Sequence, residues 1–350
     1  MRQSIDRVIG FDIGDRRIEV CVVAMADGAV LRREKLATQR SAVEQWLASE
    51  PPARIVMETG THAPWIARAA QRAGQQVIVA DARRVKLITE SSRKTDRRDA
   101  EFLARLARSD LGLLSPVHVR SERAQQVRGI LRLRDALVRS RSALINALRG
   151  VSKTDGHALP SCDAESFARR AWEALPTAAR GAAKPLLAAV LRLTREIRRY
   201  DRELERIARQ EYSQATARLE QVAGVGVLTA LAVATAVEDP LRFRNARQMA
   251  AYFGLVPRLE QSGQADPKLG ISKEGDRTTR RLLVSAAHYV LERGPDTDLK
   301  RWGLGLEARW GPKTRKRAAV AVARKLVGLL RRLWISGAAY RPLRTEAPAA

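Results

Sequence analysis

The residues best suited to chemistry are four acids spread over the first hundred residues. Asp12 ends the apolar segment VIGFD, Glu58 ends the segment RIVME, and Asp96 and Asp99 lie in the basic run RKTDRRDAEFLARLAR. Acids three residues apart share one face of a helix, and acids at the ends of neighbouring strands can meet at one point. Carboxylate oxygens are the ligands that Mg²⁺ takes, and two such ions can clamp a phosphodiester. Alternatively, Asp96 and Asp99 are acids at a helix start, where the helix dipole favours them.

A serine in a basic loop is the second candidate. Ser262 lies in the segment GLVPRLEQSG, and a serine hydroxyl can act as a nucleophile toward phosphate. No histidine stands near it in the sequence to act as its base, so its activation would have to come from elsewhere. Taken alone, the Ser-Gly pair is also explained by a simple turn.

A glycine-rich segment, VAGVGVLTA, is the third candidate. It places Gly224 and Gly226 between two helical runs, as in a helix-hairpin-helix motif. Such a turn presents backbone N–H groups and a helix N-terminus to a phosphate without reading the base. A tight turn between two helices that binds nothing is the alternative.

The overall charge points to a polyanionic partner. The formal net charge is +26 and the sequence pI is about 11.2, which is the electrostatic footprint of a protein that binds DNA or RNA. The predicted C-terminal helices carry the basic residues that we expect to contact phosphate: Arg280, Arg281, Lys313, Arg315, Lys316, Arg317, Arg324, Lys325, Arg331 and Arg332. Aromatic residues make up only 5% of the chain, which argues against binding dominated by base stacking.

Other classes of site and location are disfavoured. Cys21 and Cys162 lie in no CxxC pattern, and the four histidines lack metal-ligand spacing, so any metal is expected to be a hard cation held by carboxylates. The sequence has no apolar run of about 18 residues and no signal-peptide core. We therefore expect no membrane partner and a cytoplasmic, nucleoid-associated location.

The elements that position the acids form the pattern of an α/β domain. We expect strands at 8–12, 19–25, 29–35, 54–58 and 76–80, and helices at 41–48, 64–73, 82–89 and 96–108. Asp27-Gly28, between the second and third strands, is a hairpin signal. Three successive strands followed by alternating helices and strands predict a mixed sheet covered by helices.

The remainder of the chain is predicted to be mainly helical. After a loop at 153–161, a second helical run follows in which Pro176 and Pro185 are expected to cause early interruptions. Its amphipathic part fits a bundle linker and a coiled-coil dimerisation arm equally well. We expect four regions: an α/β domain at 1–115, a helical assembly region at 116–215, a mainly α domain with the glycine-rich turn and Ser262 at 216–340, and a disordered tail at 341–350.

Six segments, in order, resemble the DEDD transposases of bacterial insertion sequences, the recombinases guided by a bridge RNA that the element encodes. The segments are VIGFDIGDRRIEVCVV, IVMETGTHAPW, VIVADARRVKLITESSRKTDRRDAEFLARLAR, VAGVGVLTALAV, FRNARQMAAYFGLVPRLEQSG and ISKEGDRTTRRLLVSAAH. The resemblance spans about residues 5–340. It implies an RNase H-like, resolvase-type N-terminal domain, a partly coiled-coil insertion, and a transposase domain with a helix-hairpin-helix-like motif.

The resemblance also implies roles for the candidate residues. Asp12, Glu58, Asp96 and Asp99 match the acid tetrad that binds Mg²⁺, with Mn²⁺ as a substitute, and Ser262 matches the serine that forms a covalent phosphoserine with DNA. The partners implied are donor and target DNA, a guide RNA, and further copies of the chain, as a dimer that pairs into a tetramer with composite active sites. The residue before the serine is Gln261, where some members carry an acid.

The residues alone leave rival functions open. A metal-dependent DNA nuclease or Holliday-junction resolvase would use only the four acids and would not need Ser262. A nucleic-acid-binding protein without catalysis would need neither the acids nor the serine. A structural coiled-coil scaffold would leave the acids and the QSG segment unexplained.

Overall fold

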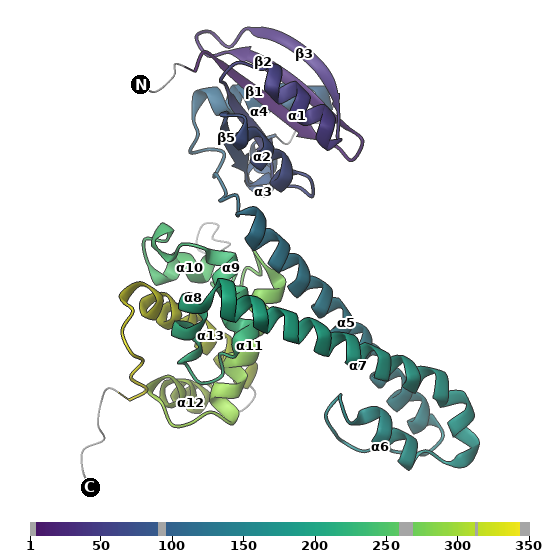
Figure 1. Cartoon of the computed structure of the whole chain (residues 1–350). Helices are drawn as coiled ribbons and strands as arrows, with labels where there is room; N and C mark the ends of the chain where they lie inside the picture. The colour runs from purple at the N-terminus through teal and green to yellow at the C-terminus, as the bar shows by residue number, and fades with distance from the viewer. Residues whose placement is uncertain (1–4, 90–95, 259–268, 312–313, 344–350) are drawn as a thin grey trace. The chain divides into compact units, whose positions relative to one another are not determined.

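The computed structural model describes residues 5–89, 96–258, 269–311 and 314–343, and it divides into two compact units, 1–122 and 123–350 (Figure 1). Each unit is described by itself. The expected division of the second unit at residue 215 stays a prediction, and most of the expected tail, 344–350, lies outside the described residues.

The first unit is built on a five-stranded mixed sheet in the order β3-β2-β1-β4-β5. The strands are β1 Arg7–Ile13, β2 Arg17–Ala24, β3 Val30–Ala37, β4 Arg54–Glu58 and β5 Gln76–Ala80. β1, β2 and β3 pair antiparallel, as a meander with short turns requires, whereas β4 and β5 join β1 in parallel. The predicted mixed sheet is confirmed.

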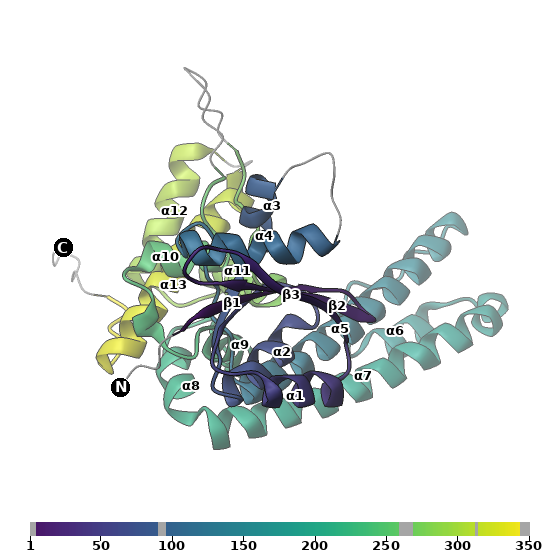
Figure 2. The same cartoon turned by 90° about the horizontal axis from the view of Figure 1, so that it is seen from above.

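Helices cover both faces of this sheet (Figure 2). α1 Arg40–Ser49 and α2 Ala63–Arg72 pack on one face, where Ile9 and Phe11 of β1 are buried. α3 Ala82–Thr89 and α4 Asp96–Ser109 pack on the other face, where Val8 of β1 and Val56 of β4 are buried. Both faces of the central strands are apolar because both are covered.

The second unit begins with two long antiparallel helices. They are α5 Glu122–Thr154 and α7 Thr177–Glu211, with the short α6 Phe167–Ala174 between them in the sequence. Ion pairs of Arg123 with Glu211 and of Arg134 with Asp201, each with an N–O distance of 2.6 Å, join the N-terminal part of α5 to the C-terminal part of α7.

The expected interruption at Pro185 is wrong, because α7 continues through that residue. The proline ring removes one backbone hydrogen bond, but Pro185 is exposed and its neighbours Ala183 and Leu187 are buried against α5 and α6. This burial on both sides of the proline offsets the missing hydrogen bond. Pro176, in contrast, stands at the start of α7 as expected.

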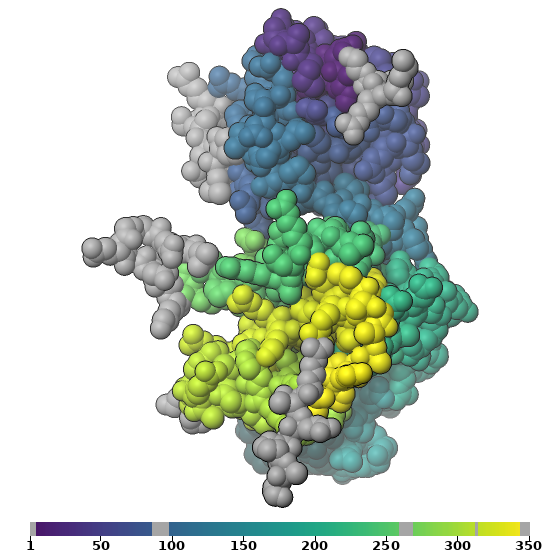
Figure 3. Space-filling model, turned by 90° about the vertical axis from the view of Figure 1, so that its left-hand side faces the viewer, coloured from purple at the N-terminus to yellow at the C-terminus, as the bar shows by residue number. Residues whose placement is uncertain are grey.

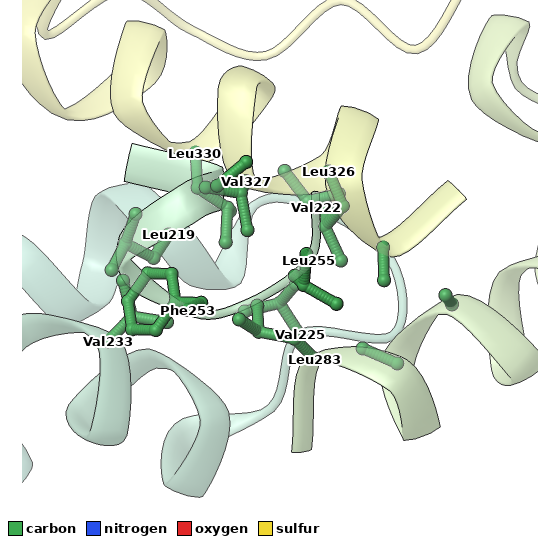
Figure 4. Close-up of a cluster of buried hydrophobic side chains, with 14 of the residues drawn as sticks. Leu219, Val222, Val225, Val233, Phe253, Leu255, Leu283, Leu326, Val327 and Leu330 are labelled. Atoms are coloured by element: carbon green, nitrogen blue, oxygen red, sulfur yellow. The ribbon is translucent and has the colours of Figure 1, made fainter. Parts of the chain in front are cut away.

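The rest of the second unit is a helical domain around one apolar core. Its elements are α8 Ser213–Glu220, α9 Val227–Val237, the 3₁₀ turn η1 Pro240–Arg242, α10 Ala246–Tyr252, α11 Arg277–Glu292, α12 Asp298–Trp310 and α13 Arg315–Ser336. Figure 4 shows side chains of α8, α9, α11 and α13 meeting in this core around Phe253. Within the described residues, no helix is both long and apolar enough to cross a bilayer.

A buried ion pair ties α5 to the start of α11. The Arg128 guanidinium lies 2.6 Å from the Asp276 carboxylate, and the two side chains are only 3% and 8% exposed. Asp276 also caps α11 by accepting a hydrogen bond from the backbone N–H of Thr279. Val127 and Leu131 of α5 also pack against Leu231 of α9, so the charge pair adds to an apolar contact between α5 and this domain.

Asp276→Asn is expected to lower the free energy of unfolding by about 3 kcal/mol, because it leaves the buried Arg128 charge without its carboxylate while the side chain keeps its shape. Urea unfolding measures the loss. Asp296→Asn is the matched control, because Asp296 forms an ion pair with Arg301 that is open to solvent and salt. Equal losses in the two variants would contradict this account.

The same pair predicts a pH dependence. Burial alone would raise the pKa of Asp276, but the Arg128 charge and the hydrogen bonds from Thr279 hold that pKa below its ordinary value. The stabilising contribution is therefore complete above about pH 5 and is lost as the pH falls through the folded-state pKa. The unfolding free energies of wild type and Asp276→Asn are expected to differ by a constant amount near neutral pH and to approach each other below about pH 4. A constant difference down to pH 3 would contradict this.

Candidate active site

Asp12 and Glu58 end two neighbouring parallel strands. The last paired residues of β1 and β4 are Phe11 and Met57, and one acid follows on each strand. Side chains alternate between the two faces of a strand, so Asp12 lies on the same face as Val8, and Glu58 on the same face as Val56. That is the face that α4 covers. The two acids thus lie side by side at the carboxyl ends of β1 and β4, on the face of the sheet that α4 covers.

α4 approaches this face more closely than side chains would allow. A Cβ atom on Gly10 would lie 1.9 Å from the carbonyl oxygen of Ala100 and 3.0 Å from the backbone nitrogen of Ala104. Gly10 precedes Asp12 by two residues and Ala100 follows Asp99, so this backbone contact brings the helix that carries Asp99 onto the strand that carries Asp12. Asp96 is the first residue of α4, and its side chain lies outside the described set.

Gly10 was not singled out from the sequence as a positioning residue. The signal was present, because a glycine inside an apolar strand marks a site where another backbone comes close. Its partner on α4 could not be read from the sequence, since the contact joins residues ninety positions apart.

A further acid on the sheet, Glu19, adds a negative charge beside Asp12, and sequence reasoning also missed it. Glu19 of β2 stands directly opposite Asp12 in the register, and Lys35 of β3 stands opposite Glu19. The Lys35 ammonium lies 2.8 Å from the Glu19 carboxylate. Lys35 therefore balances the charge of Glu19.

The described acids have the right chemistry for a hard cation but do not by themselves complete a site. Asp12, Glu58 and Asp99 are all half-buried carboxylates. Among the described residues, however, no group of three or more His, Cys, Asp or Glu side chains lies close enough together to hold an ion. A metal site here needs the Asp96 side chain, or a further approach of the acids, in addition to what the described residues provide.

Ser262 lies within residues 259–268, outside the described part of the chain, and the two ends of that segment are held together. Arg258 donates its backbone N–H to Gly270 at 2.9 Å, and Pro257 pairs with Ile271. The serine segment therefore starts and ends on one short antiparallel ladder.

The glycine-rich turn joins α8 and α9, as expected for a hairpin of two helices. Gly224 has a φ of +89°, and a Cβ atom on it would lie 2.9 Å from the carbonyl oxygen of Ala286 in α11. Gly226 immediately precedes α9. The close contact with α11 gives Gly224 a packing reason of its own, and phosphate binding by this turn stays a prediction.

The two predicted phosphate contacts on α11 are engaged within the chain. The Arg280 guanidinium donates to the carbonyl oxygens of Phe253 and Glu274, at 3.1 and 2.7 Å. Arg281 forms an ion pair with Asp135 of α5. Both contacts hold α11 in place, and contact of these residues with nucleic acid stays a prediction.

The other basic candidates lie on α13 or just before it. Arg331 donates from its guanidinium to the carbonyl oxygen of Phe243 at 2.5 Å, and the Lys325 ammonium lies over the Trp302 ring. Arg315 forms an ion pair with Glu292 at 3.1 Å, and the Arg317 guanidinium carbon lies 4.8 Å from the centre of the Trp310 ring. Lys316 is exposed, and Lys313 lies outside the described residues.

Comparisons with known proteins connect both units to one family. Residues 9–153 match the family model of DEDD transposases of the IS110 type, and residues 216–300 match that of the transposase IS116/IS110/IS902 family. The first range contains the four acids, and the second contains the glycine-rich turn and Ser262.

Similar proteins cover nearly the whole chain. The transposase for insertion sequence element IS1111A of Coxiella burnetii is 30% identical over 346 residues, which is 96% of this chain and 91% of the relative. A probable family 20 transposase of Pseudomonas aeruginosa is 32% identical over 346 residues, 95% and 98% of the two chains. The transposase for IS1328 of Yersinia enterocolitica is 29% identical over 343 residues, 94% and 96% of the two chains. The chain therefore belongs to the IS110 family of insertion-sequence transposases, enzymes that act on DNA.

Proposed function

We propose that this transposase cuts and rejoins DNA strands with Ser262 as nucleophile and with Asp12, Glu58, Asp96 and Asp99 as a Mg²⁺-binding tetrad. The observation that carries the proposal is the close backbone contact between α4 and β1 at Gly10. It brings the helix that carries Asp99 onto the face of the sheet where Asp12 and Glu58 lie. Three of the four proposed ligands, Asp12, Glu58 and Asp99, thus come from elements that meet on one face of the sheet, which supports a shared role.

The strand order supports an RNase H-like fold for the first unit. An antiparallel meander, β3-β2-β1, is extended by two parallel strands, β4 and β5, with helices on both faces. In open α/β sheets of this kind, sites form beyond the carboxyl ends of the parallel strands. Asp12 and Glu58 stand at those ends.

The four carboxylates would hold one or two Mg²⁺ ions, and Mn²⁺ would fit the same oxygen ligands. When bound, the metal supplies charge stabilisation to the phosphate and lowers the barrier to ionising the attacking hydroxyl. This chain's contribution is to place the acids. The alternation of β1 and β4 sets the direction of two of them, and the Gly10 contact sets the position of the helix that carries the other two.

The serine oxygen would lose its proton and form the new bond to phosphorus while the bond from phosphorus to one sugar oxygen breaks. That oxygen would leave as the free hydroxyl of one DNA end, and the other end would stay joined to the protein through the phosphate. The ladder at Pro257 and Ile271 would hold the ends of the serine segment during this step. A second copy of the chain would supply the tetrad opposite each serine, in a dimer that pairs into a tetramer.

The charge of +26 is large enough for two nucleic acids. We propose a guide RNA and a DNA substrate, with sequence read by base pairing to the guide and with the protein contacting backbone and shape. The helical hairpin at Gly224 and Gly226 and the basic residues of α13 are proposed phosphate contacts.

The test incubates the full chain with the RNA transcribed from beside its gene, a DNA carrying the joined element ends, and Mg²⁺. A covalent protein–DNA adduct on a denaturing gel is expected, and it should disappear with EDTA or when the RNA is left out. Nicking without an adduct would overturn the serine mechanism in favour of a metal-dependent nuclease or junction resolvase that uses the acids alone. An adduct that forms equally well without RNA would overturn guidance.

A further inference from the structure

A long groove in the second unit has no role in the proposed chemistry. It has a volume of about 1750 Å³ and lies between α10, α12 and α13, with the segment around Tyr340 at one end. The surface of α12 and α13 is in view in Figure 3, in yellow-green and yellow. Small-molecule pockets have volumes of about 300–1,000 Å³, so this groove has room for a stretch of polymer.

One side of the groove is an aromatic ridge on α12. Trp302, Leu306 and Trp310 follow each other every four residues and therefore lie on one face of the helix. Trp310 is 39% exposed. The two tryptophans are about 12 Å apart along the helix axis, which is room for roughly three bases at a stacking distance of 3.4 Å.

The other side is a cationic stripe on α13. Ala319, Val322 and Leu326 bury one face of this helix, and Arg324 and Arg331, about two helical turns apart, line the groove. The Arg331 guanidinium also donates to the carbonyl oxygen of Phe243. Of the described residues that line the groove, nine are Lys or Arg and one, Asp298, is an acid. The groove therefore combines an apolar ridge with a surface that is almost entirely positive. A ligand with flat apolar groups along an anionic chain would match both.

Cations of α13 also lie over the rings of α12. The Lys325 ammonium is 4.2 Å from the centre of the Trp302 ring, and the Arg317 guanidinium is 4.8 Å from that of Trp310. These cation–π contacts fix the rings. Because each cation covers one face of its ring, a base would stack on the Arg317 guanidinium plane or on the part of a ring that stays uncovered, with other cations of α13 near its phosphate.

We propose that this groove binds single-stranded DNA, with bases stacked along Trp302 and Trp310 and phosphates along α13. The choice of DNA as the ligand rests on the proposed function, in which the serine segment acts on a DNA strand. Pro257 and Ile271, which hold the two ends of the serine segment, also line the groove. A strand lying in the groove would pass the base of the segment that carries the nucleophile, as a DNA strand opened for exchange must.

The test measures binding of fluorescein-labelled oligo(dT), twenty nucleotides long, to the full chain by anisotropy in EDTA and without RNA. No cleavage takes place under these conditions, so the result does not depend on the catalytic proposal. Trp310→Ala and Trp302→Leu are each expected to weaken binding between about fivefold and a hundredfold. Arg324→Gln is expected to reduce the slope of log affinity against log salt by about 0.7.

Matched controls come from α6, outside the groove. Trp172 is 37% exposed and has the Arg180 guanidinium 5.4 Å from its ring, so Trp172→Ala removes the same kind of aromatic contact elsewhere. Arg170 is exposed on the same helix, and Arg170→Gln removes one surface charge. Both controls are expected to bind oligo(dT) as the wild type does. Circular dichroism checks that all variants are folded.

Photocrosslinking locates the strand. Oligo(dT) substituted with 5-iododeoxyuridine is expected to crosslink to Trp302 or Trp310 on ultraviolet irradiation, as mapped by mass spectrometry. Wild-type affinity in both groove tryptophan variants, or crosslinks confined to other regions, would overturn the proposal. Tighter binding of oligo(rU), of duplex DNA, or of an oligoglutamate of equal charge would overturn it too, in favour of RNA, a duplex or an acidic protein partner, respectively.

Discussion

Replacing Ser262 with alanine is expected to lower DNA strand exchange by about a thousandfold or more and to remove the covalent protein–DNA adduct. A nucleophile that forms a covalent intermediate has no substitute once its oxygen is gone, so the loss is far larger than that from a binding residue. The change deletes one hydroxyl group, so folding and DNA affinity should be unaffected. Strand exchange is measured by quantitative amplification of the recombined junction, and the adduct by denaturing gel.

Ser272→Ala is the matched control, because this serine follows the same segment and lies beside the ladder residue Ile271. It should recombine DNA as the wild type does. Asp12→Asn separates the two catalytic proposals, since it removes a tetrad acid and leaves the serine in place. If Ser262→Ala still nicks DNA while Asp12→Asn does not, the acids cut on their own and the serine is not the nucleophile.

Local patterns predicted much of the fold of the first unit. β4, β5 and α3 have the predicted bounds, and the ends of the other strands and helices lie within two residues of the prediction. These elements are bounded by turns and carry clear periodicities, so neighbouring residues determine them. The order of the strands in the sheet was not predictable in the same way, because it depends on pairings between distant segments such as β1 and β4.

The candidate site was predictable in residue type but not in position. The acids were identified, but the glycine that seats their helix was not, because its role appears only when β1 meets α4. Similarly, Arg281 was predicted to contact phosphate, but it forms an ion pair with Asp135. No local pattern indicated this pair, because Asp135 lies on a helix that is distant in sequence. The scarcity of aromatic residues argued against binding dominated by base stacking, and that stays a prediction; the sequence did not show that two of the six tryptophans line one groove.

Gly10→Ala is the second change with a large expected effect, a loss of at least about 4 kcal/mol in the free energy of unfolding. The added methyl group would stand 1.9 Å from the Ala100 carbonyl oxygen. The neighbouring atom is backbone in a helix and cannot rotate away, so α4 must move off the sheet or the strand must shift. Either movement separates the α4 acids from Asp12 and Glu58. Urea unfolding measures the stability, and adduct formation measures the site.

Gly60→Ala is the control for this prediction, because it adds the same methyl group in the same unit at a position with no atom within 4 Å. It should keep the wild-type stability. If Gly10→Ala folds with wild-type stability but fails to form the adduct, α4 has moved without unfolding, and the contact acts only in positioning the acids. If the variant keeps both stability and adduct formation, the close approach of α4 to β1 is not what places the tetrad, and the proposed origin of the site is wrong.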